Sequence, residues 1–264
     1  MLTAQSFDAV VDLFQRVSGI HLTEAKRPLV EGRLQKLARS RGISDLNHYV
    51  EALLKDSDQD ELVRVIDKLT TNETYFFREP KHFDFLAKWL DERERGKDGL
   101  RVWSAASSSG EEAYSLAMLL ANQLGPSHWE IIGTDLSTAM VEQARQALYP
   151  LERARHVAPA DLKRWCLKGQ GEYQGQLLIS RELRARTRFE TANLTQTLPE
   201  IGQFDVIFLR NVLIYFDANR KADIVRRVLT RLKPDGLLFT GHAESITNLG
   251  LPVRSIASAV YACA

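Results

Sequence analysis

Apolar residues in the first part of the chain recur at intervals of three and four, which is the spacing of one helix face. Five of them share a predicted helix that ends at Gly19: Phe7, Val10, Val11, Phe14 and Val17. The same kind of spacing predicts further helices over about residues 24–39, 45–55 and 58–69. Because this part shows no alternation of the β type, we expect residues 1–70 to form a small helical domain.

From about residue 98 the pattern changes to short apolar runs that alternate with amphipathic helices. The predicted strands are LRVWSA at 100–105, WEIIGTD at 129–135, FDVIFLRN at 204–211 and LLFTGHA at 237–243. Helices follow the first three of these strands, and Ser137 is a good N-cap for the second helix. KPDG, residues 233–236, is predicted as a turn before the last strand. This alternation predicts an α/β fold, a parallel sheet with helices on both faces.

A glycine-containing segment interrupts the alternation between residues 167 and 183. Its sequence, LKGQGEYQGQLLISREL, has one apolar strand at its centre, so we predict an antiparallel β-hairpin inserted at about residues 166–188. The predicted organisation is a helical domain over 1–70, a linker and helix over 71–97, and an α/β domain over 98–264.

Composition and charge exclude some classes of function. The chain has 264 residues, 44% of them hydrophobic, and a formal net charge of +1, so no broad basic field marks a nucleic-acid-binding protein. Cys166 and Cys263 lack metal-ligand spacing, so we expect reduced thiols, no metal and a cytoplasmic protein. The N-terminus has no secretory pattern, and the most apolar helical run, 113–121, is too short to span a bilayer, so no membrane insertion is expected.

Small residues and two acids follow the first predicted strand, at the edge of the sheet where α/β proteins bind ligands. The segment is SAASSSGEEAY, residues 104–114. It lacks the G-x-G-x-x-G cradle of a dinucleotide site, and Glu111 and Glu112 would repel a phosphate but could hold a cation. S-adenosylmethionine, which is cationic and has no phosphate, therefore fits better than NAD or ATP. The alternative is an ordinary tight turn between strand and helix.

Two polar residues follow other strands at this edge. Asp135 ends the second strand, where an acid can accept hydrogen bonds from both ribose hydroxyls of a nucleoside, or can simply begin a helix. Asn193 follows a short predicted strand near residues 188–190. Its side-chain amide could read an adenine edge or only form a turn.

A second polar group follows FDVIFLRN. Arg210 and Asn211 end this buried strand, which is costly unless their side chains find partners. Tyr215 lies one helical turn beyond Asn211 if the segment coils, and it either faces the crevice or belongs to the core. His242 and Glu244, after the last strand, could line the rim.

Five segments in this order resemble the chemotaxis receptor methyltransferases of the CheR type: TTNETYFFRE, RVWSAASSSGEEAYS, IIGTDLS, FDVIFLRNVLIYFD and LKPDGLLFTGHAES. The resemblance covers nearly the whole chain and implies a Rossmann-like S-adenosylmethionine methyltransferase sheet with a small N-terminal helical domain and a β-subdomain. Members of this family methylate glutamate side chains on cytoplasmic helices of chemoreceptors, which gives glutamate methyl esters and S-adenosylhomocysteine. Where many members have threonine before the glycine, Ser109 keeps the hydroxyl.

The resemblance also implies roles for single residues. It implies cofactor contacts from Asn72, Thr74, Arg78, Glu112, Asp135, Asn193, Leu194, Asn211 and Val212. It places Arg78 and Tyr215 near the reacting centre. In LTTNETYFFREP, residues 69–80, we expect the polar half to reach the cofactor crevice and the three rings to pack between the two domains.

The resemblance further suggests how a receptor is recognised. Arg33, Lys36 and Arg39 lie on one predicted helix, and they form either a solvated face or a basic surface for acidic receptor helices. The inserted hairpin resembles the β-subdomain with which some members bind a C-terminal tethering peptide of the receptor by strand addition. A monomer is expected.

Two other readings of the sequence remain. A nucleic-acid methyltransferase on the same sheet should carry a broad basic field, which the net charge of +1 speaks against. A regulatory module that only senses S-adenosylmethionine would not need Arg78 and Tyr215 at the crevice.

Overall fold

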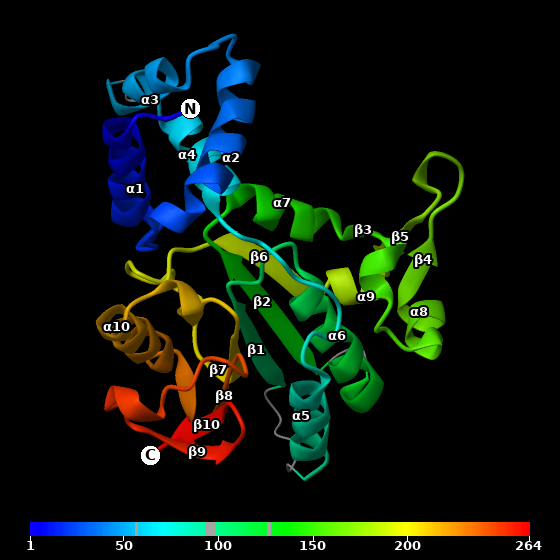
Figure 1. Cartoon of the computed structure of the whole chain (residues 1–264). Coiled ribbons are helices and arrows are strands. Elements are labelled where there is room, and N and C mark those ends of the chain that lie inside the picture. Colours follow the sequence, from blue (N-terminus) through cyan, green and yellow to red (C-terminus); the bar gives the residue numbers. More distant parts are fainter. Residues whose placement is uncertain (56–57, 93–98, 126–127) are drawn as a thin grey trace. The chain divides into compact units, whose positions relative to one another are not determined.

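The computed structural model describes residues 1–55, 58–92, 99–125 and 128–264, and they form two compact units, Met1–Thr71 and Asn72–Ala264 (Figure 1). The end of the predicted linker, residues 93–97, and residue 98, where the α/β domain was predicted to begin, lie outside the described residues. No helix among the described residues combines the length and the apolar character needed to cross a bilayer.

The first unit is all-helical, as predicted. Its helices are α1 (Ala4–Ser18), η1 (Glu24–Lys26, a 3₁₀ turn), α2 (Arg27–Ser40), α3 (Leu46–Lys55) and α4 (Gln59–Leu69). Phe7, Val10, Val11 and Phe14 of the predicted apolar face are buried. Gly19 ends α1 in the left-handed conformation, with φ 78°, which glycine adopts without a Cβ clash.

The second unit contains a seven-stranded sheet in the order β6-β2-β1-β7-β8-β10-β9 among the described residues. The strands are β1 (Leu100–Ala105), β2 (Trp129–Asp135), β6 (Thr187–Thr191), β7 (Phe204–Leu209), β8 (Leu232–Thr240), β9 (Val253–Ala257) and β10 (Val260–Cys263). The five strands from β6 to β8 are mutually parallel, whereas β10 is antiparallel to both of its neighbours. The predicted parallel α/β sheet is thus confirmed, and the antiparallel hairpin β9–β10 adds to it.

Helices cover the sheet and set the place of the site. They are α5 (Pro80–Glu92), α6 (Glu111–Leu124), α7 (Thr138–Gln146) and α10 (Ala218–Leu229), and α6 and α7 pack on β2 (Figure 1). The chain runs outward from β1 through β2 to β6 and then returns to β7 on the other side of β1. The strand order therefore reverses beside β1, and α/β proteins bind ligands at the carboxyl end of such a switch point.

A small antiparallel sheet, β3-β5-β4, lies to one side of the main sheet (Figure 1). Its elements are β3 (Leu148–Pro150), η2 (Leu151–Ala154), α8 (Pro159–Trp165), β4 (Cys166–Lys168), η3 (Gly171–Tyr173), β5 (Gln176–Ile179) and α9 (Arg181–Arg184). Strands β4 and β5 form the hairpin that the sequence predicted. The predicted insertion, residues 166–188, did not include β3. Its predicted end at residue 188 lies within β6 of the main sheet.

The predicted turn at KPDG is wrong. Strand β8 continues through these residues. Phe204 of β7 pairs with Leu232 and Val206 pairs with Leu237, and residues 233–236 therefore form a bulge opposite Asp205. The Lys233 ammonium lies 2.8 Å from the Asp205 carboxylate and holds the bulge to β7. Proline, aspartate and glycine favour turns and bulges alike, so their presence alone could not separate the two.

Candidate functional site

The turn after β1 has a strained backbone. Ala106, Ser108 and Gly110 have φ of 66°, 48° and 96°, a region that only glycine occupies without strain. The Ser108 N–H donates to Asp135 Oδ2 at 2.8 Å, and the Ser107 N–H donates to the Thr134 carbonyl at 2.8 Å. The end of β2 therefore fixes the strained turn at the end of β1.

Gly110 could not be another residue without local movement. A Cβ at this position would lie 2.9 Å from the Ala144 Cβ, 2.9 Å from the Tyr149 hydroxyl and 3.1 Å from the Phe189 ring. Helix α6 begins at the next residue, so the close packing sets where its N-terminus points.

Asp135 lies at the carboxyl end of β2, as predicted. Its Oδ1 accepts the Ser137 N–H at 2.9 Å while its Oδ2 accepts the Ser108 N–H. These two bonds orient the carboxylate at the end of β2. The Asp135 carbonyl also accepts the Ala192 N–H at 2.9 Å, which brings the segment after β6 alongside.

That segment carries Asn193 and Leu194. Asn193 Oδ1 accepts the backbone N–H of Thr195 at 3.0 Å and its hydroxyl at 2.7 Å, so the asparagine does form a local turn. Leu194 is buried, and its carbonyl accepts a hydrogen bond of 2.6 Å from Arg227. The turn is thereby anchored to α10.

The two acids at the start of α6 already have cationic partners. Buried Glu111 forms an ion pair with Arg153. Glu112 accepts a hydrogen bond of 2.7 Å from the Ser104 hydroxyl and pairs with Arg210 at 2.9 Å. Burial raises the pKa of Glu112 above its ordinary value, although Arg210 and Ser104 act in the opposite direction. Glu111 and Glu112 are therefore both paired with arginines, whereas we expected from the sequence two acids able to hold a cationic ligand.

Arg210 is the centre of this part of the site, and its side chain is 1% exposed. It pairs with Glu112 and, at 3.0 Å, with Glu79, and it also donates to the Arg78 carbonyl. Its guanidinium lies 5.8 Å from the ring centre of Phe83. Sequence reasoning noted the cost of an arginine at the end of a buried strand but gave Arg210 no role and missed Glu79, which directly follows Arg78.

The segment from Asn72 to Glu79 reaches both halves of the site. The Asn72 carbonyl accepts a hydrogen bond from the Ser108 hydroxyl at 3.3 Å, beside the β1 turn. At the other end, Arg78 donates to the Glu73 carbonyl at 2.7 Å and lies 5.9 Å from the centre of the Tyr75 ring. Thr74, between them, is half-buried. Glu79 has φ 58°, a further strained position.

The aromatic rings of this segment do not pack as expected. Phe76 is buried in the core of the second unit, edge-on to Tyr149 at 5.1 Å, and Phe77 packs on Phe83 at 5.0 Å. Tyr75 is half-buried and lies 5.3 Å from the His156 ring. The expectation that the three rings pack between the two domains was wrong, because Phe76 and Phe77 pack in the apolar core of the second unit.

Arg210, Glu79 and Glu112 are called the Arg210 cluster below. Asn211 lies beside this cluster and has a φ of 57°. Its side-chain amide donates to Glu79 Oε1 at 3.1 Å, and its N–H donates to Glu244 Oε2. Val212 follows it, and Tyr215, half-buried, ends the 3₁₀ turn η4 (Leu213–Tyr215). Glu244 is 3% exposed and accepts several backbone N–H groups, so it anchors this segment instead of lining a rim.

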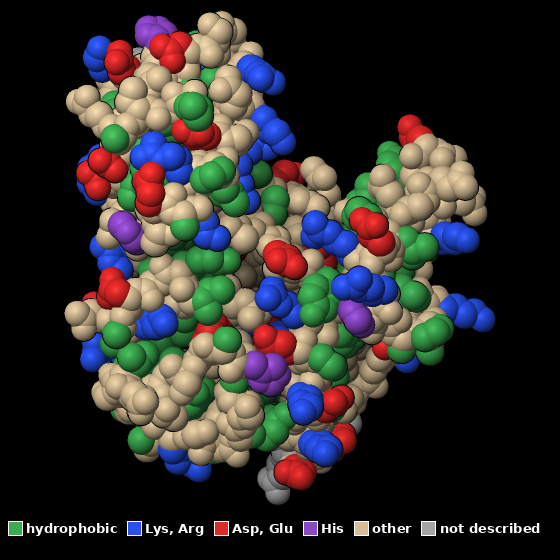
Figure 2. All heavy atoms as spheres, in the orientation of Figure 1, with side chains coloured by type: hydrophobic (Ala, Val, Ile, Leu, Met, Phe, Trp, Pro, Cys, Tyr) green, Lys and Arg blue, Asp and Glu red, His purple; other side chains and the backbone are tan. Residues whose placement is uncertain are grey.

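The three predicted docking residues belong to the first unit and differ from one another. Arg33 donates to the carbonyls of Leu69 and Thr70, at 2.9 and 2.8 Å, and so caps the C-terminus of α4. Lys36 and Arg39 are exposed on α2. Figure 2 shows basic side chains along the side of the unit where α2 runs.

The residues present fit S-adenosylmethionine. The switch point has an oriented carboxylate at the end of β2, and the segment after β1, SAASSSGEEAY, has no glycine cradle for a pyrophosphate. The Ser107 hydroxyl is buried in the strained turn and has no hydrogen-bond partner among the described residues, which is unusual unless a ligand supplies one.

Comparison with known proteins agrees with this geometry. Residues 72–261 match the family model described as CheR methyltransferase, SAM binding domain, and residues 5–70 match the one described as CheR methyltransferase, all-alpha domain. The chemotaxis protein methyltransferase of Escherichia coli (strain K12) is 40% identical over 266 residues, which cover 99% of this chain and 91% of that protein. The chemotaxis protein methyltransferase of Salmonella typhimurium is 39% identical with the same coverage. Chemotaxis protein methyltransferase 2 of Pseudomonas aeruginosa is 36% identical over 98% of this chain and 93% of its own length.

Proposed function

The chain belongs to the CheR methyltransferase family and is an S-adenosylmethionine-dependent methyltransferase of chemotaxis, and we propose that it methylates glutamate side chains on the cytoplasmic helices of chemoreceptors. The products are glutamate methyl esters and S-adenosylhomocysteine. The observation that carries this proposal is the match of both family domains, in order, over nearly the whole chain.

We assign the cofactor to the carboxyl ends of β1 and β2 at the switch point. Asp135 would hold the ribose hydroxyls, and the turn at Asn193 and Leu194 would lie against the base. Asn72, Thr74 and Glu112 would surround the amino-acid end, with Asn211 and Val212 beside it. When bound, S-adenosylmethionine supplies a methyl group on a cationic sulfur.

The chain's own part in the reaction is positioning and the exclusion of water. A substrate glutamate is already ionised at neutral pH, so no strong base is required. Alignment of the reacting groups can contribute roughly 7–11 kcal/mol in well-oriented systems. In our proposal Arg78 orients the substrate carboxylate and the Tyr215 hydroxyl donates a hydrogen bond nearby. Arg78 can do so while it keeps its bond to the Glu73 carbonyl, because a guanidinium has five N–H donors.

Receptor recognition would use two surfaces. Lys36 and Arg39 on the first unit offer positive charge to acidic receptor helices. In the small sheet, β4 is an edge strand, and Leu167 on it is 59% exposed, so a C-terminal receptor peptide could add a strand there. We expect the enzyme to act as a monomer.

The test is the chemistry of the methylated product. Purified chain, S-adenosylmethionine with a labelled methyl group and a receptor cytoplasmic fragment should give label that mild base releases as methanol, because an ester is base-labile. Replacement of the modified glutamates by alanine should remove the label. Base-stable label on the fragment would indicate N-methylation and contradict the proposal, and label on nucleic acid instead of the fragment would support the rival enzyme class.

A further inference from the structure

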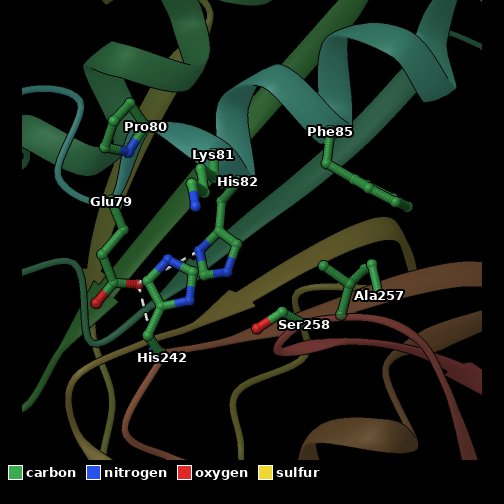
Figure 3. A pocket seen from close by; sticks show the side chains of 9 residues that line it. Glu79, Pro80, Lys81, His82, Phe85, His242, Ala257 and Ser258 are labelled. Atoms are coloured by element: carbon green, nitrogen blue, oxygen red, sulfur yellow. Dashed lines mark hydrogen bonds and ion pairs between the residues drawn. The ribbon is translucent and has the colours of Figure 1, made fainter.

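A cavity of about 590 Å³ lies beside the Arg210 cluster, on the side toward the C-terminal hairpin (Figure 3). Residues at the start of α5 form one wall, among them His82 and Phe85, and Ser258 and Val260 form another. His242 lines it as well. Neither the proposed cofactor contacts nor the proposed substrate contacts use His82 or His242.

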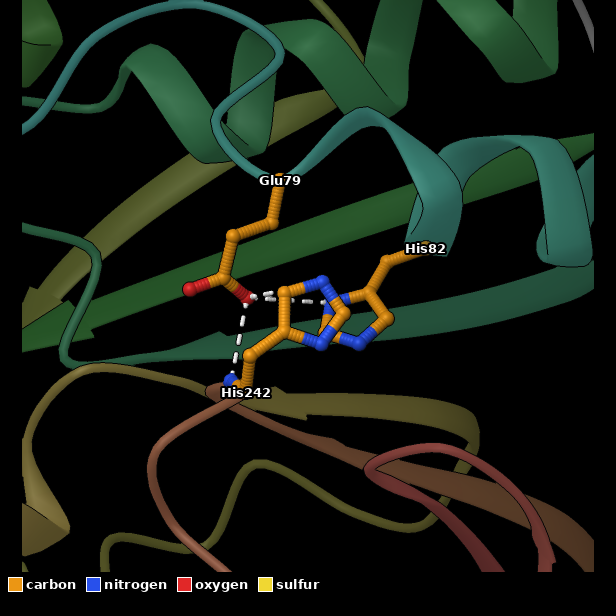
Figure 4. Close-up of side chains that lie close together, drawn as sticks. All are labelled: Glu79, His82 and His242. Atoms are coloured by element: carbon orange, nitrogen blue, oxygen red, sulfur yellow. Dashed lines mark hydrogen bonds and ion pairs between the residues drawn. The ribbon is translucent and has the colours of Figure 1, made fainter.

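Three potential metal ligands converge at this cavity (Figure 4). The Oε2 atom of Glu79 lies 3.4 Å from His82 Nδ1 and 3.9 Å from His242 Nε2, and one ligand atom from each residue lies within 4.8 Å of the others. Ligand atoms at about 2.0–2.2 Å around a tetrahedral zinc ion are separated by roughly 3.3–3.6 Å. The exposed His242 ring, whose centre lies 4.4 Å from that of His82 at an interplanar angle of 35°, would therefore have to turn and move closer to bind the same ion.

His82 is the second observation that points to a ligand. It is 1% exposed, and neither ring nitrogen makes a hydrogen bond of normal geometry within the described residues. The polar groups around it include the Glu79 carboxylate, 3.4 Å from Nδ1, the backbone of Ser258 and the His242 ring, 4.4 Å away between ring centres. A buried polar group without a hydrogen-bond partner costs free energy, and a bound cation would give a His82 ring nitrogen a partner.

We propose that Glu79, His82 and His242 form a binding site for a divalent transition-metal cation of the zinc type. Two imidazole nitrogens and one carboxylate oxygen suit zinc and its neighbours, whereas magnesium and calcium prefer oxygen ligands only. The cavity leaves room for water in the remaining coordination position.

The surrounding charges are compatible with a cation. Arg210 approaches Glu79 Oε2 at 3.0 Å and opposes a metal there, but the same guanidinium is also paired with Glu112. Asn211 donates to the other oxygen of Glu79 and thereby fixes the orientation of the carboxylate, which is a common support for a metal ligand. Lys81 lines the cavity but is exposed and can turn its ammonium to solvent.

The group of Glu79, His82 and His242 could not be predicted from the sequence. Glu79 and His82 are three residues apart at the start of α5, but His242 lies in the loop after β8 and is brought to them only by the sheet. The expectation of no metal rested on cysteine spacing and did not consider these histidines.

Calorimetric titration of the full chain with zinc chloride, after chelator treatment and without cofactor or receptor, tests the proposal. We expect one saturable site per chain, weakened at least about tenfold by His82→Phe and by His242→Ala. His48→Ala, which removes an exposed histidine of the first unit, should leave the titration unchanged.

His242→Ala keeps the experiment decisive if the buried His82 variant misfolds, because His242 is exposed. Absence of a saturable site, or binding that His242→Ala does not weaken in a variant with unchanged circular dichroism, would overturn the proposal. Since no cofactor is present, either result leaves the methyltransferase proposal untouched.

Discussion

At the scale of single residues, Asp135 shows how a ligand group is oriented in advance. Its carboxylate is held by the N–H groups of Ser108 and Ser137, and a ribose would meet it already aligned. We predict that Asp135→Asn weakens S-adenosylhomocysteine binding roughly tenfold to hundredfold, the loss expected for a hydrogen bond to a charged group. Calorimetry checks this, with Glu142→Gln on the exposed face of α7 as control. Equal affinities of the two variants would remove Asp135 from the cofactor site.

Arg78 has a different prediction because it is proposed to act on the substrate. Arg78→Ala should lower the single-turnover rate of receptor methylation by about a hundredfold at saturating cofactor, since a misplaced carboxylate loses alignment. Arg226→Ala, an exposed arginine on α10, should not change the rate. An Arg78→Ala enzyme that keeps the wild-type rate would end the proposed role.

Cys166 offers a prediction that depends on pH. Burial, with a smaller contribution from Asp161, raises the pKa of its thiol to about 11. Only the thiolate reacts, so at pH 8 alkylation of Cys166 in a Cys263→Ser chain should be about a hundredfold slower in the folded protein than in urea. The folded rate should rise with pH up to about 11. A folded rate that levels off near pH 9 would contradict the raised pKa.

Only part of the site could be predicted from the sequence. A carboxylate after a strand and small residues before a helix are local features, so Asp135 and the β1 turn could be placed from sequence. The cluster of Arg210 with Glu79 and Glu112 could not, because its members come from three segments that only the sheet brings together.

At the scale of elements, the turn between β1 and α6 depends on Gly110. We predict that Gly110→Ala lowers the free energy of unfolding by about 2–4 kcal/mol, from left-handed backbone strain and from crowding by Ala144, Tyr149 and Phe189. Gly175→Ala also has a positive φ but meets nothing within 4 Å, so it should cost only about 1–2 kcal/mol. Denaturant unfolding measures both. Equal losses would show that packing at Gly110 contributes nothing.

Periodicity predicted the long elements and failed at the short ones. The helices of the first unit and the central strands have strong apolar patterns, and they formed near their predicted positions, although β8 (Leu232–Thr240) begins and ends earlier than the predicted strand at 237–243. Strand β9 was missed because most of its residues are exposed, so no apolar run marks it. Strand β3 spans only Leu148–Pro150, too short for an alternation to be seen. Tertiary pairing, not local sequence, makes both of them strands.

At the scale of the whole molecule, the net charge of +1 conceals local basic surfaces. Lys36→Glu with Arg39→Glu should weaken binding to a receptor fragment several-fold and flatten its salt dependence, because exposed charges act through a screened field. Arg33 is left intact in this test because it caps α4. The control is Lys88→Glu with Arg226→Glu, which reverses two exposed charges of the second unit. If both double variants bind alike, α2 is only a solvated face.

The most direct test of the proposed cofactor site is a structure of the complex with S-adenosylhomocysteine. We predict ribose hydroxyls within hydrogen-bond distance of Asp135, the amino-acid end beside Glu112 and Asn72, and the sulfur facing Arg78 and Tyr215. A ligand bound away from the carboxyl ends of β1 and β2, or one that turns its sulfur away from Arg78, would contradict it.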